Sequence, residues 1–480
     1  MKLKKLLKEI SVQDVKGSRE VEVTGISSNS RTVAPGNLFI AKKGLTHDGS
    51  RFIPDAIASG AVAIATDLYD PFFPDVVQII HPNVQALEAQ IAKAYYNNAA
   101  EKLFMVGITG TNGKTTTSYL VKHILEAPKE LCGLIGTVEW IVGENRHPSL
   151  FTTPDVITNH KLFHEMVING CSSCVMEVSS HAIEQGRVES IDFDVAVFTN
   201  LTQDHLDFHK SMENYAAAKA KLFLKQPKTA VVNGDSPWTD SILQGYCGKV
   251  MKYGIDCEAA LRAHEIQLTP HKTIFNLIYA GQTYSVSSAL VGRYNVYNTL
   301  AAISVALSKG ISIEHILTAV KTFKPVGGRL EPVPNQKKLS IFVDYAHTDD
   351  ALKNVLETLR EFKEGRIITV FGCGGNRDQQ KRPKMAKVAE THSDVVIVTS
   401  DNPRQEDPQE IIRQIFSGFA NPGHAIVEPD RREAIHRAVH MAGPNDLILI
   451  AGKGHETYQI FSHQTIEFDY RKIAQEAALS

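Results

Sequence analysis

The chain has 480 residues, which at a typical domain size of ~150 residues predicts roughly three domains. Hydrophobic residues make up 43% of the chain and charged residues 22%, a composition that excludes disorder over most of the length. The formal net charge of −2 excludes a global basic field, so we expect neither a nucleic-acid partner nor attraction to an anionic membrane.

The sequence shows no feature of membrane insertion or export. No apolar run approaches the ~18 residues that a membrane helix needs. Residues 1–10 interleave lysines with leucines and do not form the core of a signal peptide. We therefore expect a cytoplasmic protein without membrane insertion.

Residues 1–98 alternate short apolar runs with polar turns, as at 37–41, 61–65 and 76–80, and predict a small mixed α/β domain. From Phe104 the pattern changes to strand, glycine-rich turn and helix, with a helix expected over 115–126 and strands near Val175 and Val195. Continuous apolar strands separated by helices indicate a parallel sheet covered on both faces. Alternation between about 262 and 292 predicts an antiparallel extension of that sheet, followed by helices over 296–308 and 313–323.

The segment 324–328 breaks the helical pattern and marks the next boundary. Four apolar runs follow, at 341–343, 367–371, 395–399 and 447–450, separated by helical stretches. The expected fold class is α/β with three domains. A small mixed α/β domain spans 1–98, a central P-loop-type doubly wound parallel sheet with an antiparallel extension spans 99–326, and a Rossmann-like α/β domain spans 327–480.

The six cysteines are too few for a disulfide scaffold. Cys171 and Cys174 have CxxC spacing, but a zinc site would need a second such pair and a redox site would need the pair at a helix start. Cys174 instead begins an apolar run, 174–178, that is typical of a buried strand. We expect both thiols to behave as small buried hydrophobes.

The segment Gly107–Thr116 has the sequence GITGTNGKTT and lies between an apolar strand and a helix. It offers open backbone N–H groups, a helix N-terminus, the Lys114 amine and a Thr115 hydroxyl, which together suit nucleotide phosphates and Mg²⁺. Its glycines stand at 107, 110 and 113, so the spacing departs from strict Walker A. The position between strand and helix favours a phosphate loop over a glycine-rich turn with an incidental lysine.

Oxygen ligands for Mg²⁺ are expected at the ends of nearby strands. Glu177 follows one apolar strand, and Asp204 and His205 follow another. The carboxyl ends of parallel strands line one crevice, so these side chains can face the phosphate loop. The alternative for Asp204 and His205 is a solvated acidic turn.

These pieces, in this order, resemble the Mur ligase family of ATP-dependent amino-acid ligases, which build the peptidoglycan stem peptide. The resemblance covers the whole chain and rests, beyond the phosphate loop, on Glu177 in MEVSSH, Asp204-His205, Ala218-Lys219, Asn295–Asn298, Gly328-Arg329, Asp344–His347 and Ala451–Glu456. Asp401–Arg404, with the sequence DNPR, resembles the motif of the family's third-residue ligases that select meso-2,6-diaminopimelate over L-lysine. A guanidinium such as that of Arg404 matches a carboxylate with two parallel hydrogen bonds.

The resemblance implies four sets of site residues. The implied ATP residues are Gly110, Thr111, Asn112, Gly113, Lys114, Thr115, Thr116, Asn295, Asn298, Arg329, Asp344 and His347. For UDP-N-acetylmuramoyl-L-alanyl-D-glutamate they are Ser30, Leu45, Thr46, His47, Thr152, Thr153, Ser179 and Arg187, with Asn29 where the family usually has Asp. For meso-2,6-diaminopimelate they are Arg377, Asp401, Asn402, Pro403, Arg404, Gly452 and Glu456. Lys114, Glu177, His205 and Lys219 are the implied catalytic residues, and Thr115, Glu177, His205 and Lys219 the implied Mg²⁺ ligands, with Lys219 carbamylated to N6-carboxylysine.

The implied activity is formation of a carbon–nitrogen bond through an acyl phosphate, with ATP as co-substrate, Mg²⁺ as cofactor and closure of the three domains around the substrates. Arg329, just past the expected linker, would report on that closure. A monomer is expected.

Two alternatives remain open. Another ligase of the superfamily, adding L-lysine or resembling folylpolyglutamate synthase, is the nearer one, and the latter should lack the front domain and the DNPR segment. A P-loop NTPase switch is the other, and it would hydrolyse ATP independently of both substrates.

Overall fold

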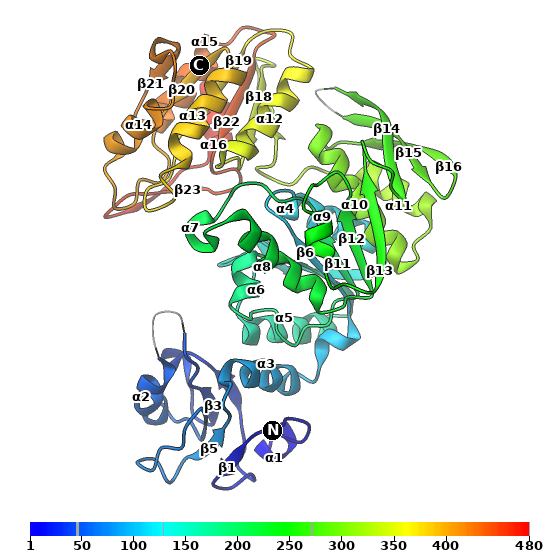
Figure 1. Cartoon of the computed structure of the whole chain (residues 1–480). Helices are drawn as coiled ribbons and strands as arrows, with labels where there is room; N and C mark the ends of the chain where they lie inside the picture. Colours follow the sequence, from blue (N-terminus) through cyan, green and yellow to red (C-terminus); the bar gives the residue numbers. More distant parts are fainter. Residues whose placement is uncertain (45–47, 128, 270–271, 480) are drawn as a thin grey trace.

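The computed structural model describes residues 1–44, 48–127, 129–269 and 272–479, and its three main sheets use consecutive stretches of the chain (Figure 1). The central unit lies between the N-terminal and C-terminal units (Figure 1). The α/β class expected from the sequence is confirmed. Within the described ranges, no helix combines the length and apolarity that crossing a bilayer requires.

The N-terminal unit holds a five-stranded sheet in the order β1-β5-β4-β3-β2, in which only the β1 pairing is antiparallel. Its elements are α1 (Leu3–Leu6), β1 (Asp14–Lys16), β2 (Gly25–Ser27), β3 (Asn37–Ile40), α2 (Ile53–Ala58), β4 (Ala63–Thr66), β5 (Val77–Ile80) and α3 (Val84–Tyr95). Leu87 and Ile91 of α3 belong to the buried core formed with β3, β4 and β5. The helix leads directly toward the central unit (Figure 1).

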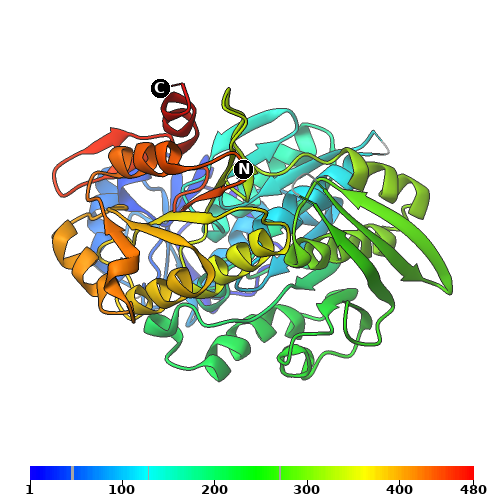
Figure 2. The ribbon, with the colours of Figure 1, turned by 90° about the horizontal axis from the view of Figure 1, so that it is seen from above.

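The central unit contains an eleven-stranded sheet in the order β16-β15-β14-β13-β12-β11-β6-β10-β7-β8-β9. The strands are β6 (Phe104–Thr109), β7 (Leu131–Ile135), β8 (Glu139–Val142), β9 (Asn145–Pro148), β10 (Cys171–Glu177), β11 (Val195–Phe198), β12 (Thr229–Asn233), β13 (Lys249–Gly254), β14 (Leu261–Leu268), β15 (Thr273–Tyr279) and β16 (Gln282–Ser288). In this order, the strands from β14 through β6 to β7 pair in parallel. The expected antiparallel extension is β14 to β16, which projects away from the C-terminal unit (Figure 2).

Helices cover both faces of the central sheet, as the continuous apolar strands predict. One core includes α4 (Lys114–Glu126), α10 (Arg293–Lys309) and α11 (Ile313–Thr322). The opposite core includes α5 (Val156–Ile168), α6 (Ser180–Glu184), α8 (Met212–Leu224) and α9 (Thr239–Leu243), and the short α7 is Leu206–His209. Cys171 and Cys174 are buried on β10, so their interpretation as small core residues is confirmed.

The C-terminal unit has a six-stranded sheet in the order β17-β18-β22-β19-β20-β21, antiparallel only at β17. Its strands are β17 (Glu331–Pro332), β18 (Ser340–Asp344), β19 (Ile367–Phe371), β20 (Val395–Val398), β21 (Ala425–Val427) and β22 (Leu447–Ala451), with a separate hairpin of β23 (Tyr458–Ile460) and β24 (Thr465–Glu467). Helices α12 (Asp349–Glu361), α13 (Lys381–His392) and α14 (Pro408–Phe416) share one core. Helices α15 (Arg431–Met441) and α16 (Tyr470–Ala477) share the core on the other face.

Candidate active site

The phosphate loop joins β6 to α4 in the expected position, at the carboxyl end of a parallel strand. Gly113 precedes the helix with φ +85°, and a Cβ there would collide with the Asn298 carboxamide. A Cβ on Gly110 would collide with the Thr199 hydroxyl. Glycine at both positions therefore lets the backbone approach these side chains. The N–H groups of Thr111 and Asn112 donate to the backbone and side-chain oxygens of Asn200, each at 2.9 Å.

Lys114 folds onto its own loop. Its Nζ donates to the carbonyl oxygens of Gly110 and Thr111, at 2.9 and 2.8 Å. Burial lowers the pKa of the Lys114 amine, and the negative charge of Glu177 opposes that shift. An anion placed at the loop would restore the solvation that the buried amine lacks.

Glu177 is fully buried and contacts the loop, as its position after a strand predicts. One carboxylate oxygen accepts from the Thr115 hydroxyl at 3.0 Å and from the Thr137 hydroxyl at 2.9 Å, and the other accepts from the Thr137 N–H at 2.9 Å. These donors hold the carboxylate in a fixed orientation beside the first turn of α4.

His205 and Lys219 approach the loop from α7 and α8. His205 Nε2 lies 3.3 Å from an Asp204 oxygen, and 45% of its side-chain surface stays exposed. The cleft walls nevertheless exclude enough water to lower the pKa of His205 to about 4, with Asp204 opposing that shift. Asp204 is itself partly buried, so the pair is not a simple solvated turn.

Lys219 is 1% exposed, and its Nζ donates to the carbonyl oxygen of Gly110 at 2.9 Å. The amine also lies 4.5 Å from the centre of the Tyr215 ring. Burial, and then the positive charge of Lys114, lower the pKa of Lys219 well below its usual value. A lowered pKa favours the neutral, nucleophilic amine, which is the form that can react with carbon dioxide.

Asn295 and Asn298 lie on the first turns of α10, which packs against α4, and both are buried. Asn298 Oδ1 accepts from the Thr117 hydroxyl at 3.2 Å, and its Nδ2 donates to Asn295 Oδ1 at 2.9 Å. Asn295 Nδ2 in turn donates to the Val291 carbonyl at 2.8 Å. These asparagines therefore form a buried chain beside the phosphate loop and are not exposed polar groups of a helix surface.

The C-terminal unit contributes Arg329, whose guanidinium donates to the Thr115 hydroxyl at 3.2 Å. Asp344 fixes the backbone next to it, because its carboxylate accepts from the N–H groups of Leu330 and Ala346 at 2.6 and 2.7 Å. Burial raises the pKa of Asp344, with Arg329 opposing. His347 lies at the start of α12 with an exposed side chain, and its carbonyl oxygen accepts from Lys381 Nζ at 2.8 Å.

Sequence reasoning missed Asp350, on the first turn of α12. Its carboxylate accepts from Asn112 Nδ2 at 2.6 Å and from the Thr202 hydroxyl at 2.9 Å. Both donors belong to the central unit, so this contact joins the C-terminal unit to the phosphate loop. The pair Asp349-Asp350 was visible in the sequence, but acidic residues at a helix start are also ordinary helix-capping residues.

Most residues implied for the muramoyl dipeptide lie together next to Glu177. The Thr153 hydroxyl donates to the Glu177 carbonyl at 2.8 Å and accepts from the Ser179 N–H at 3.1 Å. Arg187 donates to the Thr153 carbonyl at 2.8 Å. The Thr152 hydroxyl lies 3.1 Å from the Thr137 hydroxyl that donates to Glu177.

The remaining residues of that set are in the N-terminal unit. Ser30 begins a short 3-10 helix, and the side chain of Asn29 caps it by accepting from the Arg31 N–H at 3.1 Å. Asn29 therefore performs the local capping that the family's usual Asp could perform. Leu45, Thr46 and His47 lie outside the described residues. No contact links Ser30 to the cluster around Glu177 within the described part of the chain.

The residues implied for the amino acid lie after β19, β20 and β22. Arg404 has φ +54°, and its guanidinium donates to the Gly375 carbonyl at 2.8 Å. Burial, and then the charge of Arg377, lower the pKa of Arg404. A Cβ on Gly452 would lie 2.7 Å from an Asp401 oxygen, so only glycine allows this approach. Pro403 stands between Asn402 and Arg404 in the same turn.

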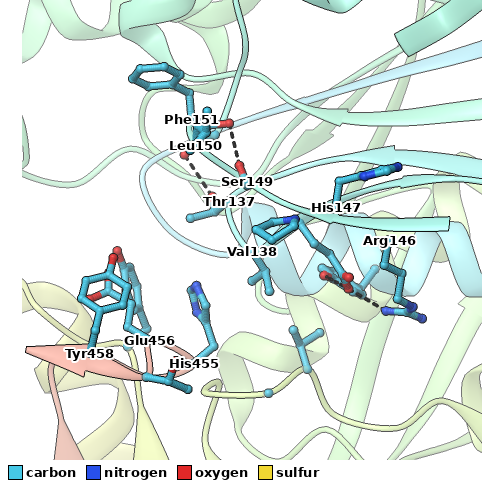
Figure 3. A pocket seen from close by; sticks show the side chains of 18 of the residues that line it. Thr137, Val138, Arg146, His147, Ser149, Leu150, Phe151, His455, Glu456 and Tyr458 are labelled. Atoms are coloured by element: carbon cyan, nitrogen blue, oxygen red, sulfur yellow. Dashed lines mark hydrogen bonds and ion pairs between the residues drawn. The ribbon is translucent and has the colours of Figure 1, made fainter. Parts of the chain in front are cut away.

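A cavity of about 1040 Å³ separates the central unit from the C-terminal unit. Figure 3 shows Thr137, Val138, Ser149, Leu150 and Phe151 on one side and His455, Glu456 and Tyr458 across from them. Thr152 and Arg377 also line it. Thr137 and Thr152, which lie beside Glu177, therefore line the same cavity as Arg377 and Glu456 of the amino-acid set. The β8-β9 hairpin that forms one wall was not expected from the sequence.

A magnesium ion fits the donors beside the loop, although no cluster of three or more His, Cys, Asp or Glu suited to a metal occurs in the described part of the chain. Mg²⁺ usually keeps several waters and takes only one or two carboxylates together with substrate phosphates. The buried Glu177 carboxylate and the Thr115 hydroxyl, 3.0 Å apart, are donors of that kind.

Three family models match consecutive stretches of the chain. They are "Mur ligase family, catalytic domain" over residues 22–102, "Mur ligase middle domain" over 108–306, and "Mur ligase, glutamate ligase domain" over 328–454. These stretches contain the three main sheets nearly in full.

Relatives match over the whole length. The UDP-N-acetylmuramoyl-L-alanyl-D-glutamate–2,6-diaminopimelate ligase of Chlamydia caviae is 46% identical over 485 residues and covers 100% of both chains. The ligase of that name from Caldanaerobacter subterraneus is 44% identical, covering 99% of this chain and 98% of the relative. A solved structure of a ligase of that name has a TM-score of 0.73 and 30% identity, covering 100% and 98% of the two chains. A MurF structure from Acinetobacter baumannii, at 18% identity and a TM-score of 0.65 over 90% and 91%, shows the shared fold. Motif order, structure and full-length relatives agree, and the chain belongs to the Mur ligase family.

Proposed function

We propose that the chain is an ATP-dependent ligase that joins meso-2,6-diaminopimelate to UDP-N-acetylmuramoyl-L-alanyl-D-glutamate in peptidoglycan precursor synthesis. The observation that carries the proposal is the position of Glu177 between two sites. Its carboxylate contacts Thr115 of the phosphate loop and Thr137 of the cavity wall. A carboxylic acid held in the cavity would therefore lie next to the phosphates of ATP. The names of the full-length relatives support the same substrates.

In the first step, the γ-carboxylate of the D-glutamate residue attacks the γ-phosphate of ATP, which gives an acyl phosphate and ADP. Lys114, the loop N–H groups and Arg329 stabilise the charge that develops on the transferred phosphoryl group. Thr115 and Glu177 would hold a Mg²⁺ ion, which would neutralise further phosphate charge. Lys219 as N6-carboxylysine, with His205, would hold a second ion.

In the second step, the neutral amine of the diamino acid attacks the acyl carbon. An amide bond forms as the bond between the acyl carbon and the phosphate oxygen breaks, and the departing inorganic phosphate can accept the proton that the amine loses. Arg377 and Glu456 line the cavity opposite the Glu177 side, which suits the delivery of the amine from the C-terminal unit. Closure of the units would exclude water, which otherwise hydrolyses the acyl phosphate.

Each unit would have its own role in this reaction. Residues 1–98 would bind the uridine end, residues 99–326 would bind ATP and Mg²⁺, and residues 327–480 would bind the amino acid. The protein would act as a monomer in the cytoplasm, where ATP and the nucleotide-linked dipeptide are available.

Phosphate release tests the proposal. The protein is incubated with ATP, Mg²⁺ and UDP-N-acetylmuramoyl-L-alanyl-D-glutamate, with either meso-2,6-diaminopimelate or L-lysine as the last component. We expect release with meso-2,6-diaminopimelate that stops when Mg²⁺ is chelated. Release only with L-lysine would favour a lysine-adding ligase, and release that needs neither substrate would favour a P-loop switch. No release with either diamino acid would refute the proposal.

A further inference from the structure

Lys453 lies between two residues of the implied amino-acid set. Its side chain is 1% exposed, and its Nζ donates to Asn402 Oδ1 at 2.9 Å and to a Glu456 oxygen at 2.7 Å. The amine also lies 4.6 Å from the centre of the Tyr458 ring. Burying an ammonium group destabilises the folded state unless such partners replace its lost hydration. Asn402 and Glu456 therefore both stabilise the charged form of Lys453.

The two contacts on Asn402 fix the orientation of its carboxamide. Oδ1 accepts from Lys453 Nζ and from the Ile460 N–H, each at 2.9 Å. Neither group can act as an acceptor, so a flipped carboxamide would place its NH₂ against two donors. Nδ2 makes no hydrogen bond to a residue within the described ranges. Asn402 therefore keeps an unused donor, and it stands two residues before Arg404.

Cations and carboxylates both lie around this turn, and the carboxylates are Asp401 and Glu456. Arg377 lies close enough to Arg404 to lower the pKa of its guanidinium, and Lys453 adds a third cation. Glu456 supplies an acceptor, and the ion pair with Lys453 holds it in place. Meso-2,6-diaminopimelate carries a carboxylate on its distal carbon that L-lysine lacks, so lysine has one more net positive charge. Repulsion from buried cations acts against lysine more strongly than against the dicarboxylic acid.

We propose that Lys453 is a specificity-determining positioning residue that fixes the Asn402 carboxamide as a donor and contributes a buried positive charge favouring a diamino dicarboxylic acid over lysine. The inference rests on the proposed function, because it concerns the amino acid that the ligase adds. Lys453 acts through Asn402 and Glu456 and does not itself touch the substrate.

The test compares kcat/KM for the two amino acids in the wild-type enzyme and in Lys453→Met, which keeps the side-chain length but removes the donor and the charge. Loss of a charge-assisted hydrogen bond predicts a fall of about 10–100-fold in kcat/KM for meso-2,6-diaminopimelate. For L-lysine we expect a change below about 3-fold, so the ratio between the two falls by about 10-fold or more. The KM for ATP should stay within about 2-fold, because Lys453 does not contact the phosphate loop.

Lys472→Met is the matched control, since Lys472 is an exposed lysine of the same unit that pairs with Glu467 at 3.3 Å. Lys472→Met should leave kcat/KM for both amino acids unchanged. A parallel loss for both amino acids in Lys453→Met, with an unchanged ratio, would show a merely structural role and overturn the inference.

If Lys453→Met does not fold, Asn402→Asp is tested in its place. This change keeps an acceptor for Lys453 and Ile460 and turns the unused donor into an acceptor. It should abolish the preference for meso-2,6-diaminopimelate, and a retained preference would overturn the inference. A wild-type enzyme inactive with both amino acids would refute the proposed function itself, whereas an active wild type with an unchanged ratio in the variant would refute only the role of Lys453.

Discussion

Arg329 of the C-terminal unit donates a hydrogen bond to the Thr115 hydroxyl of the phosphate loop, with 3.2 Å between the two atoms. The same hydroxyl donates to Glu177 at 3.0 Å. Gly328, which precedes Arg329, has φ +72°, and a Cβ at that position would collide with the backbone of Gly454 and His455. A cation from one unit is therefore part of the phosphate site of another.

Replacing Arg329 by alanine should raise the KM for ATP by about 10–100-fold, because a hydrogen bond from a charged group is lost beside the phosphates. Arg329→Lys keeps the charge without the planar fork and should give an intermediate value. Steady-state phosphate release and calorimetric ADP binding measure the effect. Arg432→Ala serves as a control, because Arg432 forms an exposed ion pair with Glu476. A normal KM for ATP in Arg329→Ala would contradict this role.

Asp350 makes another contact between these units, through Asn112 and the Thr202 hydroxyl. Asp350→Ala should lower kcat by about 10-fold, because the contact between the two units loses two hydrogen bonds worth about 1 kcal/mol each. Asp350→Asn retains an acceptor oxygen, so its kcat should fall less. Small-angle X-ray scattering with ATP present should show a larger radius of gyration for the alanine variant.

Asp349→Ala is the control for Asp350, because it removes the neighbouring carboxylate from the same helical turn. Equal effects of the two alanine variants would mean that helix capping, and not contact with Asn112, explains the loss.

Sequence reasoning located the phosphate loop and Glu177 because both stand where a parallel strand ends, and the carboxyl ends of β6 and β10 are adjacent in the sheet. Asp350 and Lys453 were missed for a physical reason. An aspartate at a helix start and a lysine between glycines have ordinary local roles, and only tertiary packing places them against Asn112 and Asn402.

The β8-β9 hairpin escaped prediction because its second strand carries no apolar alternation. All four residues of β9 (Asn145–Pro148) are exposed. Its strand conformation comes from pairing with β8, where Trp140 lies opposite His147. Patterns of hydrophobicity identify strands that bury a face, and this strand instead borders a cavity.

Arg404→Ala should impair use of the amino acid much more than use of ATP. The guanidinium is half-buried, lies in the turn that carries Asn402 and donates to the Gly375 carbonyl. We expect the KM for meso-2,6-diaminopimelate to rise by about 100-fold and the KM for ATP to change by less than about 3-fold. Arg404→Lys should recover little, because lysine cannot form the paired hydrogen bonds. Equal losses for both substrates in initial-rate assays would count against the assignment.

His160 should make the central unit less stable in mild acid. It is fully buried on α5, where its Nε2 lies 3.1 Å from the Ser190 hydroxyl, and burial lowers its pKa to about 4. In the unfolded chain its pKa is about 6.5, so between these values the unfolded state binds more protons than the folded state. The free energy of unfolding therefore rises with pH across this window and falls as the pH drops through it. From about pH 7 to about pH 5 the loss from this one group is roughly 1–2 kcal/mol.

His160→Gln removes the titrating group. Between about pH 7 and about pH 5, the free energy of unfolding of the variant should therefore fall by roughly 1–2 kcal/mol less than that of the wild type. This difference holds even if the variant is less stable than the wild type at both pH values. Urea unfolding followed by tryptophan fluorescence measures it, because the chain's 2 tryptophans, Trp140 and Trp238, both lie in the central unit. His315→Gln is the control, since His315 lies on α11 of the same unit and is exposed. An unchanged pH dependence in His160→Gln would show that His160 takes up no extra proton on unfolding, and that its burial does not depress its pKa.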